Sequence, residues 1–311
     1  MEANKKKMSF YSPLRYPGGK NGLYLFVSNL INENKYLGKS YAEPYAGGCG
    51  LALKLLFEGV VNEIYLNDFD NSIYSFWNSI LNQADEFCNW IESLEITVDN
   101  WHYYKNILND AHNHNPFEIA QATFFLNRTN VSGVIKGGVI GGQNQNGKYK
   151  INARFNKSKL VEKIRLIYEK RSNIHFFNLD AIDFLNHIKS LDSIFIYLDP
   201  PYHLKGSELY LNFYKNNDHV KLFDYLNNLD LDFILSYDNS QFIKDTYNKF
   251  KTYSFNISQS TSNKIGEEII IFSDNLKYKK SIKMLNSAKK IRQKKLPKQN
   301  IVLANGILNE N

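Results

Sequence analysis

The sequence has few cysteines and no long apolar run, and each absence narrows the class of protein. Cys49 and Cys88 are the only two cysteines among 311 residues, so neither a disulfide framework nor a cysteine metal motif is expected, which fits a reducing cytoplasm. No run of about 18 apolar residues occurs, so no membrane-spanning helix is expected. The lysine-rich N-terminus precedes no apolar segment of the secretory type, and we therefore expect a cytoplasmic protein.

Composition and charge indicate a globular chain with a strongly basic C-terminal segment. Apolar side chains make up 43% of the residues, enough for one large or two modest domains. From Asn275 onward there are ten Lys or Arg residues and one acid, a net +9 against +7 for the whole chain, so the rest sums to −2. We expect residues 276–311 to form a basic tail or helix. Such a segment is typical of a protein that binds nucleic acid, and equally of a solvated terminus.

Strand and helix patterns alternate along most of the chain, which predicts an α/β fold with a doubly wound sheet. The predicted strands are residues 40–43, 63–68, 174–179, 193–198 and 233–237, with a helix at 51–58. Residues 251–257 and 267–272 are expected to pair as an antiparallel hairpin at the end of the sheet.

Residues 71–161 interrupt this alternation of strands and helices. Helical spacing around Trp77 and Trp90 gives way to a loop rich in Gly and Asn, which is typical of an inserted domain with a hairpin-like lobe. We therefore predict a sheet domain of residues 1–70 and 162–275, interrupted by a mostly helical domain of residues 71–161.

A glycine-rich turn follows the first predicted strand. Its segment AEPYAGGCGL carries, in order, Glu43, Pro44, Tyr45, Gly47 and Gly50. Glycines let the backbone approach a ligand closely, although they also serve simply to turn a chain. Asp68, about 20 residues later, is placed either to accept hydrogen bonds from a ribose or to cap a helix. Asp180 is likewise either an acceptor for an adenine amine or a cap. The G-x-G-x-x-G spacing of NAD sites is absent, which favours another adenosine ligand.

The residues Asp199, Pro200, Pro201 and Tyr202 directly follow the apolar strand IFIYL. Two prolines hold the backbone extended and lack N–H groups, so the carbonyl groups of Asp199 and Pro200 are free to face a pocket. Two acceptors that hold the hydrogens of an exocyclic amine favour an sp³ nitrogen, whose lone pair can attack a methyl sulfonium. Tyr202 offers a plane on which a base extruded from a duplex can stack. A surface turn is the less favoured alternative.

In these motifs and their order the chain resembles the Dam-type (D12 class, α group) DNA adenine-N6 methyltransferases, over residues 14–273. The motifs are RYPGGK at residues 15–20, AEPYAGGCG, Asp68 and DPPY. The resemblance implies a class I, Rossmann-like methyltransferase fold, S-adenosyl-L-methionine (AdoMet) as methyl donor with no metal, and double-stranded DNA as substrate. It also implies that residues 71–161 recognise the target, and that the enzyme, associated with the nucleoid, serves restriction–modification beside a cognate restriction endonuclease, or epigenetic marking.

The resemblance also assigns individual residues. It implies that the RYPGGK segment covers the cofactor through Tyr16, Pro17, Gly18, Gly19 and Lys20. Without it, Lys20 is as well explained as a surface lysine. The segment NRTNVSGVIK resembles a recognition hairpin, which implies DNA contacts from Arg128, Ser132 and Lys136, with a solvated loop as the alternative. The Gly-rich residues 137–142 depart from the members that read GATC and argue against that specificity. Residues 236–240 and 267–272 resemble late motifs that shape the target pocket.

Other functions fit parts of the pattern. The sequence does not indicate an oligomeric state. Cytosine-N4 methylation uses the same chemistry, although the Asp of DPPY and the motif order favour adenine. A non-catalytic DNA- or AdoMet-binding subunit would be expected to have lost DPPY or the glycine turn, and both are intact. An RNA or protein methyltransferase is less favoured because related motifs there often begin with Asn. His219, in the loop predicted after DPPY, is expected to be structural or to face DNA, since the reaction requires no general base.

Overall fold

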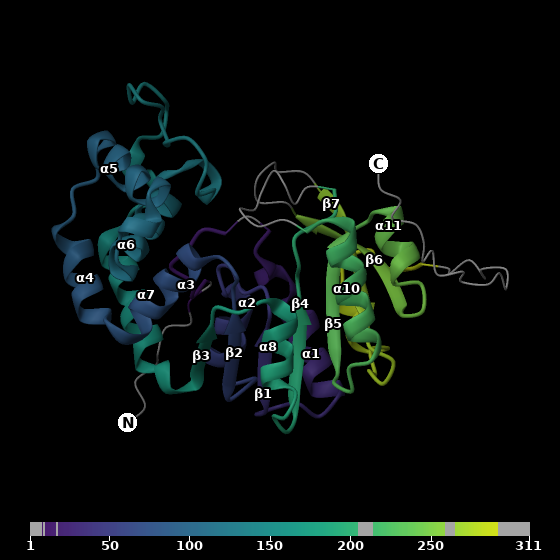
Figure 1. Ribbon diagram of the computed structural model, residues 1–311. Helices are drawn as coiled ribbons and strands as arrows, with labels where there is room; N and C mark the ends of the chain where they lie inside the picture. The colour runs from purple at the N-terminus through teal and green to yellow at the C-terminus, as the bar shows by residue number, and fades with distance from the viewer. Residues whose placement is uncertain (1–7, 9, 17, 205–213, 259–264, 292–311) are drawn as a thin grey trace, which may run out of the picture.

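The computed structural model describes residues 8, 10–16, 18–204, 214–258 and 265–291. A central eight-stranded sheet has the order β3-β2-β1-β4-β5-β7-β6-β8 (Figure 1). Its strands are β1 (Ser40–Glu43), β2 (Glu63–Asn67), β3 (Ile174–Phe177), β4 (Ile194–Leu198), β5 (Phe233–Asp238), β6 (Lys251–Ser258), β7 (Ile265–Phe272) and β8 (Lys289–Lys290). The strands from β3 to β5 are parallel, whereas β7 is antiparallel to both β5 and β6. The predicted α/β sheet with an antiparallel hairpin end is thus confirmed.

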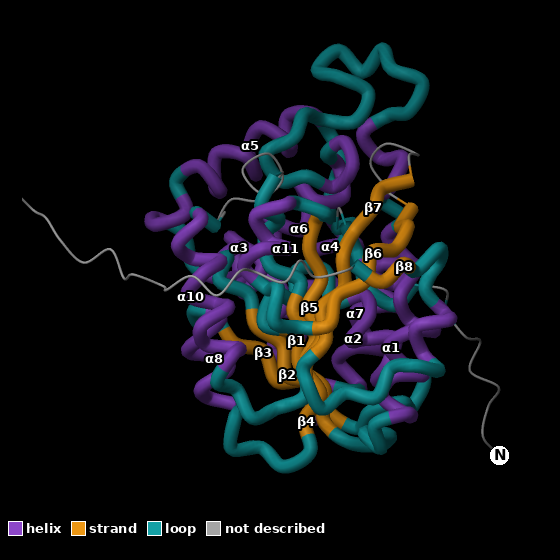
Figure 2. Tube along the Cα trace, turned by 90° about the vertical axis from the view of Figure 1, so that its right-hand side faces the viewer, coloured by secondary structure: helices purple, strands orange, loops and turns teal. Residues whose placement is uncertain are grey.

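Helices cover both faces of the sheet, which is why its central strands are apolar on both sides. One layer contains α1 (Tyr24–Glu33) and α2 (Gly50–Phe57), and the other α8 (Ala181–Ile188), α10 (Asn216–Asn227) and α11 (Gln241–Thr246). Figure 2 shows α1 and α2 on one side of the strands and α8 and α10 on the other. Along β4 the buried side chains alternate between the layers, with Tyr197 packed in the first and Ile196 and Leu198 in the second.

Five further helices lie between β2 and β3 in the sequence and form a body beside the β3 end of the sheet (Figure 1). They are α3 (Asn71–Asn82), α4 (Ala84–Ser93), α5 (Val98–Asn109), α6 (Pro116–Thr129) and α7 (Lys157–Glu169). Their core is aromatic: Phe76 stacks on Phe124 with ring centroids 5.4 Å apart, and Phe87 meets both rings edge-on. The boundary predicted at residue 161 falls inside α7, so we propose that the inserted domain extends to Glu169. No described helix is long and apolar enough to cross a membrane.

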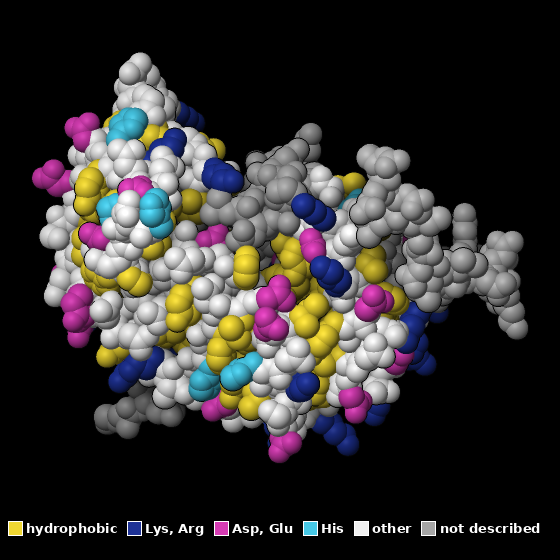
Figure 3. Space-filling model, in the orientation of Figure 1, with side chains coloured by type: hydrophobic (Ala, Val, Ile, Leu, Met, Phe, Trp, Pro, Cys, Tyr) yellow, Lys and Arg dark blue, Asp and Glu magenta, His cyan; other side chains and the backbone are white. Residues whose placement is uncertain are grey.

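The last described residues, 276–291, pack against the body of the protein. Leu276 and Leu285 are buried, and the Glu33 carboxylate at the end of α1 accepts hydrogen bonds from both the N–H and the hydroxyl of Ser281. The segment forms a short 3-10 turn and then β8, so its described part is neither a free tail nor a long helix. Its lysines are exposed, and Figure 3 shows Lys and Arg side chains gathered on that side of the molecule. Residues 292–311 lie outside the described residues.

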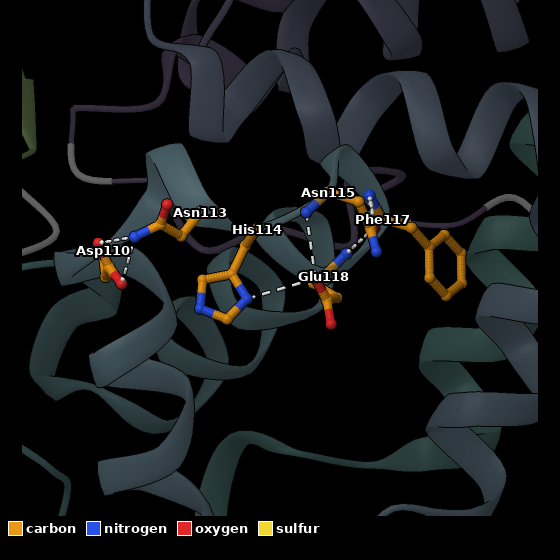
Figure 4. Close-up of polar contacts among 6 residues, drawn as sticks. All are labelled: Asp110, Asn113, His114, Asn115, Phe117 and Glu118. Carbon is orange, nitrogen blue, oxygen red and sulfur yellow. Dashed lines mark hydrogen bonds and ion pairs between the residues drawn. The ribbon is translucent and has the colours of Figure 1, made fainter.

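A reciprocal pair of hydrogen bonds begins α6, the helix that leads into the predicted recognition hairpin (Figure 4). The Asn115 side chain accepts hydrogen bonds from the N–H groups of Phe117 and Glu118, each 3.0 Å long. The Glu118 carboxylate in turn accepts the N–H of Asn115 at 3.1 Å. Pro116 follows at the first helical position, where its missing N–H removes no helical hydrogen bond.

We predict that Asn115→Ala lowers the free energy of unfolding by about 1 kcal/mol, because two N–H groups of the first turn lose their acceptor. Asn113→Ala is the matched control, since its side chain bonds only the exposed carboxylate of Asp110 in the same loop. Urea unfolding of both variants measures the difference. Equal effects for the two substitutions would contradict the assigned cap.

Candidate active site

A cavity of about 800 Å³ opens at the carboxyl ends of the parallel strands, where ligand sites of open α/β sheets form. The loops that follow β1 and β4 both line the cavity. The glycine-rich turn and the Asp199 corner, by which we mean residues 199–202, therefore face one space. The predicted site residues in its lining are Tyr16, Gly18, Gly19, Lys20, Glu43, Pro44, Tyr45, Gly50, Asp68, Lys136, Asp180, Asp199 and Pro201. Those that do not line it are Gly47, Arg128, Ser132, Pro200 and Tyr202. Pro17 lies outside the described residues.

The glycine turn makes room for another part of the chain. A Cβ on Gly47, whose φ is +48°, would lie 2.6 Å from the Tyr16 ring, and one on Gly50 would lie 2.4 Å from the Asn21 amide. The N-terminal segment of residues 15–21 therefore packs directly onto the turn. Gly47 itself donates its N–H to Asp68 at 2.8 Å, and its carbonyl accepts the Trp77 indole N–H at 2.9 Å. The sequence predicted that the backbone of this turn approaches a ligand closely. In the structure the turn lines the cavity, and it also packs closely against the N-terminal segment.

Asp68 holds the glycine turn and does not cap a helix. Its two carboxylate oxygens accept the N–H groups of Gly47, at 2.8 Å, and Asp70, at 2.9 Å. The cap of α3 is Asp70, which accepts the N–H of Ser72 at 2.8 Å, so the cap interpretation of Asp68 is wrong. Burial is the main reason that the pKa of Asp68 is raised, to about 7.

Asp180 caps a helix, as one of its two interpretations predicted, whereas its role as an acceptor for an adenine amine remains a prediction. Its carboxylate caps α8 by accepting the N–H of Ile182 at 2.9 Å, and the residue also lines the cavity. Two apolar residues that sequence reasoning missed, Phe69 and Ile182, line the same cavity and follow Asp68 and Asp180 closely in the sequence. The Phe69 ring is 61% exposed directly after Asp68, which makes it available to a planar ligand. For Phe69, an aromatic residue next to the acid that follows β2 was the only signal in the sequence.

Lys20 is buried, so the surface interpretation of this residue is wrong. It opens the short helix η1 (Lys20–Leu23) and is 6% exposed. Its Nζ lies 3.2 Å from Asp199 Oδ2 and 3.4 Å from Glu268 Oε2, and donates to the Tyr202 hydroxyl at 2.5 Å. The other Asp199 oxygen accepts the Ser236 hydroxyl at 2.6 Å. The Asp199 side chain is therefore fixed from both sides. Glu268 belongs to residues 267–272, the segment predicted to shape the target pocket, although no role was predicted for this residue by itself.

Asp238 at the end of β5 fixes the backbone of the Asp199 corner. Its carboxylate accepts the N–H groups of His203 at 2.9 Å and Leu204 at 3.1 Å, just beyond Tyr202. Residues 236–240, predicted to shape the target pocket, thus contact the corner through both Ser236 and Asp238.

Buried acids give the cavity a chemistry suited to a cation. Glu43 is 7% exposed and accepts the Tyr41 hydroxyl at 2.8 Å. Burial, with a smaller contribution from the charge of Asp199, raises the pKa of Glu43 to about 8. Asp68 and Asp180 add further carboxylates to the lining. Acids, glycine backbone and an exposed aromatic ring around one cavity fit AdoMet, which carries hydroxyl groups, a planar base and a cationic sulfur.

The residues expected to contact DNA occupy different environments. Arg128 donates to the backbone carbonyl groups of Pro13 and Arg154, and burial, with Arg15 and Arg154 nearby, lowers its pKa to about 9. Ser132, with φ of +57°, lies outside the cavity, whereas the exposed Lys136 lines it. Of the three, only Lys136 is placed to meet a ligand that enters the cavity.

His219 lies in α10 and not in a loop. It is fully buried, and its Nδ1 is 2.8 Å from the Tyr237 hydroxyl. Burial lowers its pKa to about 4, so the ring is neutral at physiological pH. The structural role expected of this residue is confirmed, and the DNA-facing alternative is wrong.

The N-terminal segment also contacts the predicted recognition hairpin. Asn127 on α6 accepts the Arg15 N–H at 2.8 Å and donates to the Arg15 carbonyl at 2.7 Å and the Gly133 carbonyl at 3.0 Å. A Cβ on Gly133 would lie 2.3 Å from the Arg15 carbonyl oxygen. The segment therefore lies between the hairpin and the glycine turn, and it belongs to both parts of the site.

We predict that Gly47→Ala destabilises the protein by about 1–3 kcal/mol more than Gly59→Ala, because only the former forces a methyl group into the Tyr16 ring. Both glycines have positive φ, +48° and +71°, but a Cβ on Gly59 meets nothing within 4 Å. Chemical denaturation of the two variants separates steric contact from backbone strain. Similar losses would show that Tyr16 does not pack as described.

Comparison with known sequences agrees with this geometry. No curated protein sequence matches the chain. A sequence profile of the D12 class N6 adenine-specific DNA methyltransferases matches residues 16–260, which contain the glycine turn, the inserted helices and the Asp199 corner. The matched region is most of the chain, and the chain therefore belongs to the D12 class N6 adenine-specific DNA methyltransferase family.

Proposed function

We propose that this enzyme transfers a methyl group from AdoMet to N6 of an adenine extruded from double-stranded DNA at a specific sequence. The observation that carries the proposal is the single cavity of about 800 Å³ lined by both the glycine turn and the Asp199 corner. When bound, AdoMet supplies a methyl group activated by a sulfonium. A base inside a duplex cannot reach such a cavity, so it must leave the stack.

The carboxyl ends of β1, β2 and β3 are the proposed cofactor site. Asp68 would accept hydrogen bonds from ribose hydroxyls, and Asp180 from an adenine amine. Phe69 and Ile182 would flank the adenine ring, because both are apolar and line the cavity near these acids. The backbone of Gly18 and Gly19 would cover the ligand from the N-terminal segment.

The corner at Asp199 is the proposed site of the target amine. Its carboxylate and the Pro200 carbonyl would accept the two N6 hydrogens, which localises the nitrogen lone pair. The contacts of Lys20 and Ser236 hold the carboxylate in one orientation before the substrate arrives. Lys20 also donates to the Tyr202 hydroxyl, which fixes the end of the DPPY segment, although the ring itself does not line the cavity. The proton leaves N6 after methyl transfer, and no general base is required.

We predict that Asp199→Asn lowers kcat at least about 100-fold, because an amide presents a donor where the reaction needs an acceptor. AdoMet affinity should change little, since the proposed cofactor acids are untouched. Transfer of labelled methyl groups to DNA, followed by nucleoside analysis, measures the loss and identifies the base. Asp192→Asn, an exposed acid at the opposite end of β4, is the control. N4-methylcytosine as the product of the unaltered enzyme would overturn the proposed substrate.

We predict that Lys136→Ala weakens DNA binding and reduces the slope of log K against log salt by about 1, if Lys136 meets a phosphate. The exposed Lys39 at the amino-terminal edge of the sheet provides a control, Lys39→Ala, that should leave the slope unchanged. Fluorescence anisotropy with a DNA duplex at several salt concentrations gives both slopes. An unchanged slope for the Lys136 variant would remove this residue from the DNA interface.

The biological setting that we propose is restriction–modification, with a cognate restriction endonuclease, or epigenetic marking. The proposal rests on the family and on the insert at residues 71–169, which we propose reads the target sequence. Modified-base sequencing of DNA from cells that express the gene would give the methylated motif. Methylation of every adenine regardless of sequence would contradict a site-specific role.

A further inference from the structure

The second carboxylate beside Lys20 has no part in the reaction described above. Glu268 on β7 places its oxygens 3.5 and 3.4 Å from Lys20 Nζ, and its side chain is only 8% exposed. The preceding Glu267 points to the other side of the strand, is exposed, and accepts a hydrogen bond from Asn239 at 2.6 Å. Two adjacent acids of one strand thus lie in opposite environments.

The Lys20 site contains more acids than cations. Asp199 lies 3.2 Å from Lys20 Nζ, so that pair is balanced without Glu268. Glu43 is a further buried acid near Asp199, but its pKa of about 8 leaves it mostly protonated at neutral pH, so it supplies no cation and little charge. Among the described residues, Glu268 therefore has no cation that it does not share with Asp199.

Within the part of the chain that the structure describes, the other elements packed against Glu268 supply no compensating charge. Its cross-strand partner on β5 is Asp238, whose carboxylate is engaged by backbone N–H groups of the corner. Its partner on β6 is Phe255. The end of β4 contributes the Tyr197 and Tyr202 hydroxyls, which are neutral. The ionised form of Glu268 thus gives the site an excess negative charge.

An excess buried charge costs stability, so packing alone does not explain an ionised Glu268 at this position. Burial, with the charge of Asp199, raises the pKa of Glu268, although Lys20 acts in the opposite direction. In the unfolded chain a Glu ionises near its ordinary pKa of about 4.3. Because the folded pKa is the higher one, the folded protein loses stability as pH rises from that value through the raised pKa.

We propose that Glu268 is a positioning residue for methyl transfer: it shares the Lys20 ammonium with Asp199 and leaves a net negative charge beside the reacting amine. The proposal rests on the proposed function. As the N6 lone pair forms the new N–C bond, the electrons of the broken C–S bond stay on sulfur and positive charge moves to N6. One N6 proton then leaves to water. Preorganised negative charge stabilises that shift, whereas Lys20 and Asp199 alone would cancel each other.

Glu268→Gln tests this role, with Glu267→Gln as the matched control on the same strand. We expect Glu268→Gln to lower kcat about tenfold while the Kd for AdoMet changes less than about twofold. The increase of kcat with pH that accompanies ionisation of Glu268 should disappear in this variant alone. Residues 267–272 were predicted to shape the target pocket, but Glu267 is exposed and is not in the lining of the cavity, so Glu267→Gln should retain both the kcat and the pH profile of the unaltered enzyme. If Glu268→Gln also retains both, the proposal is wrong.

A second measurement needs no substrate. Without DNA or AdoMet, the Tm of Glu268→Gln relative to the unaltered protein should rise as pH increases above the ordinary range of a Glu, because Lys20 keeps Asp199 as its partner. A variant that is less stable at every pH, or that does not fold, would make Glu268 a structural residue and overturn the proposal. If the unaltered enzyme makes no N6-methyladenine, the proposed function fails instead, and the Tm comparison still tests the buried charge.

Discussion

The buried ammonium group of Lys20 is the contact on which the arrangement of the site depends. It joins η1 to the corner after β4 and to β7, through Asp199, Tyr202 and Glu268. Leaving a buried cation with no acidic partner costs about 3–5 kcal/mol, so Lys20 is stable there because Asp199 balances its charge. Through these contacts Lys20 brings together the N-terminal segment, the Asp199 corner and the hairpin end of the sheet.

The same N-terminal segment links the sheet to the inserted helices. Tyr16 packs onto the glycine turn, and the backbone of Arg15 pairs with Asn127 of α6. The insert also reaches the turn directly, because the Trp77 indole N–H donates to the Gly47 carbonyl. A short stretch of chain thus contacts the proposed cofactor loop, the Asp199 corner and the predicted recognition hairpin, so the proposed parts of one reaction lie around one cavity.

Local patterns predicted the sheet well, because strands buried on both faces are short apolar runs that end at Gly, Asp or Pro. The strand at 40–43 and the DPPY corner were found in this way. The features that the sequence did not predict are contacts between residues that lie far apart in the sequence. Nothing local distinguishes Glu268 from Glu267, shows that Arg128 turns toward the carbonyl groups of Pro13 and Arg154, or shows that the glycines accommodate Tyr16 and Asn21. The predicted domain boundary at residue 161 was also wrong as a helix end, because α7 continues to Glu169.

The central claim is that the Asp199 corner holds an adenine amine in the cavity that the glycine turn shares. A crystal structure of the enzyme with a DNA duplex and S-adenosylhomocysteine would test it most directly. The account predicts an extrahelical adenine with N6 within hydrogen-bonding distance of the Asp199 carboxylate and the Pro200 carbonyl, and the sulfur atom facing N6 across the cavity. A target base still stacked in the duplex, or a nucleoside bound away from Asp68 and Asp180, would contradict it.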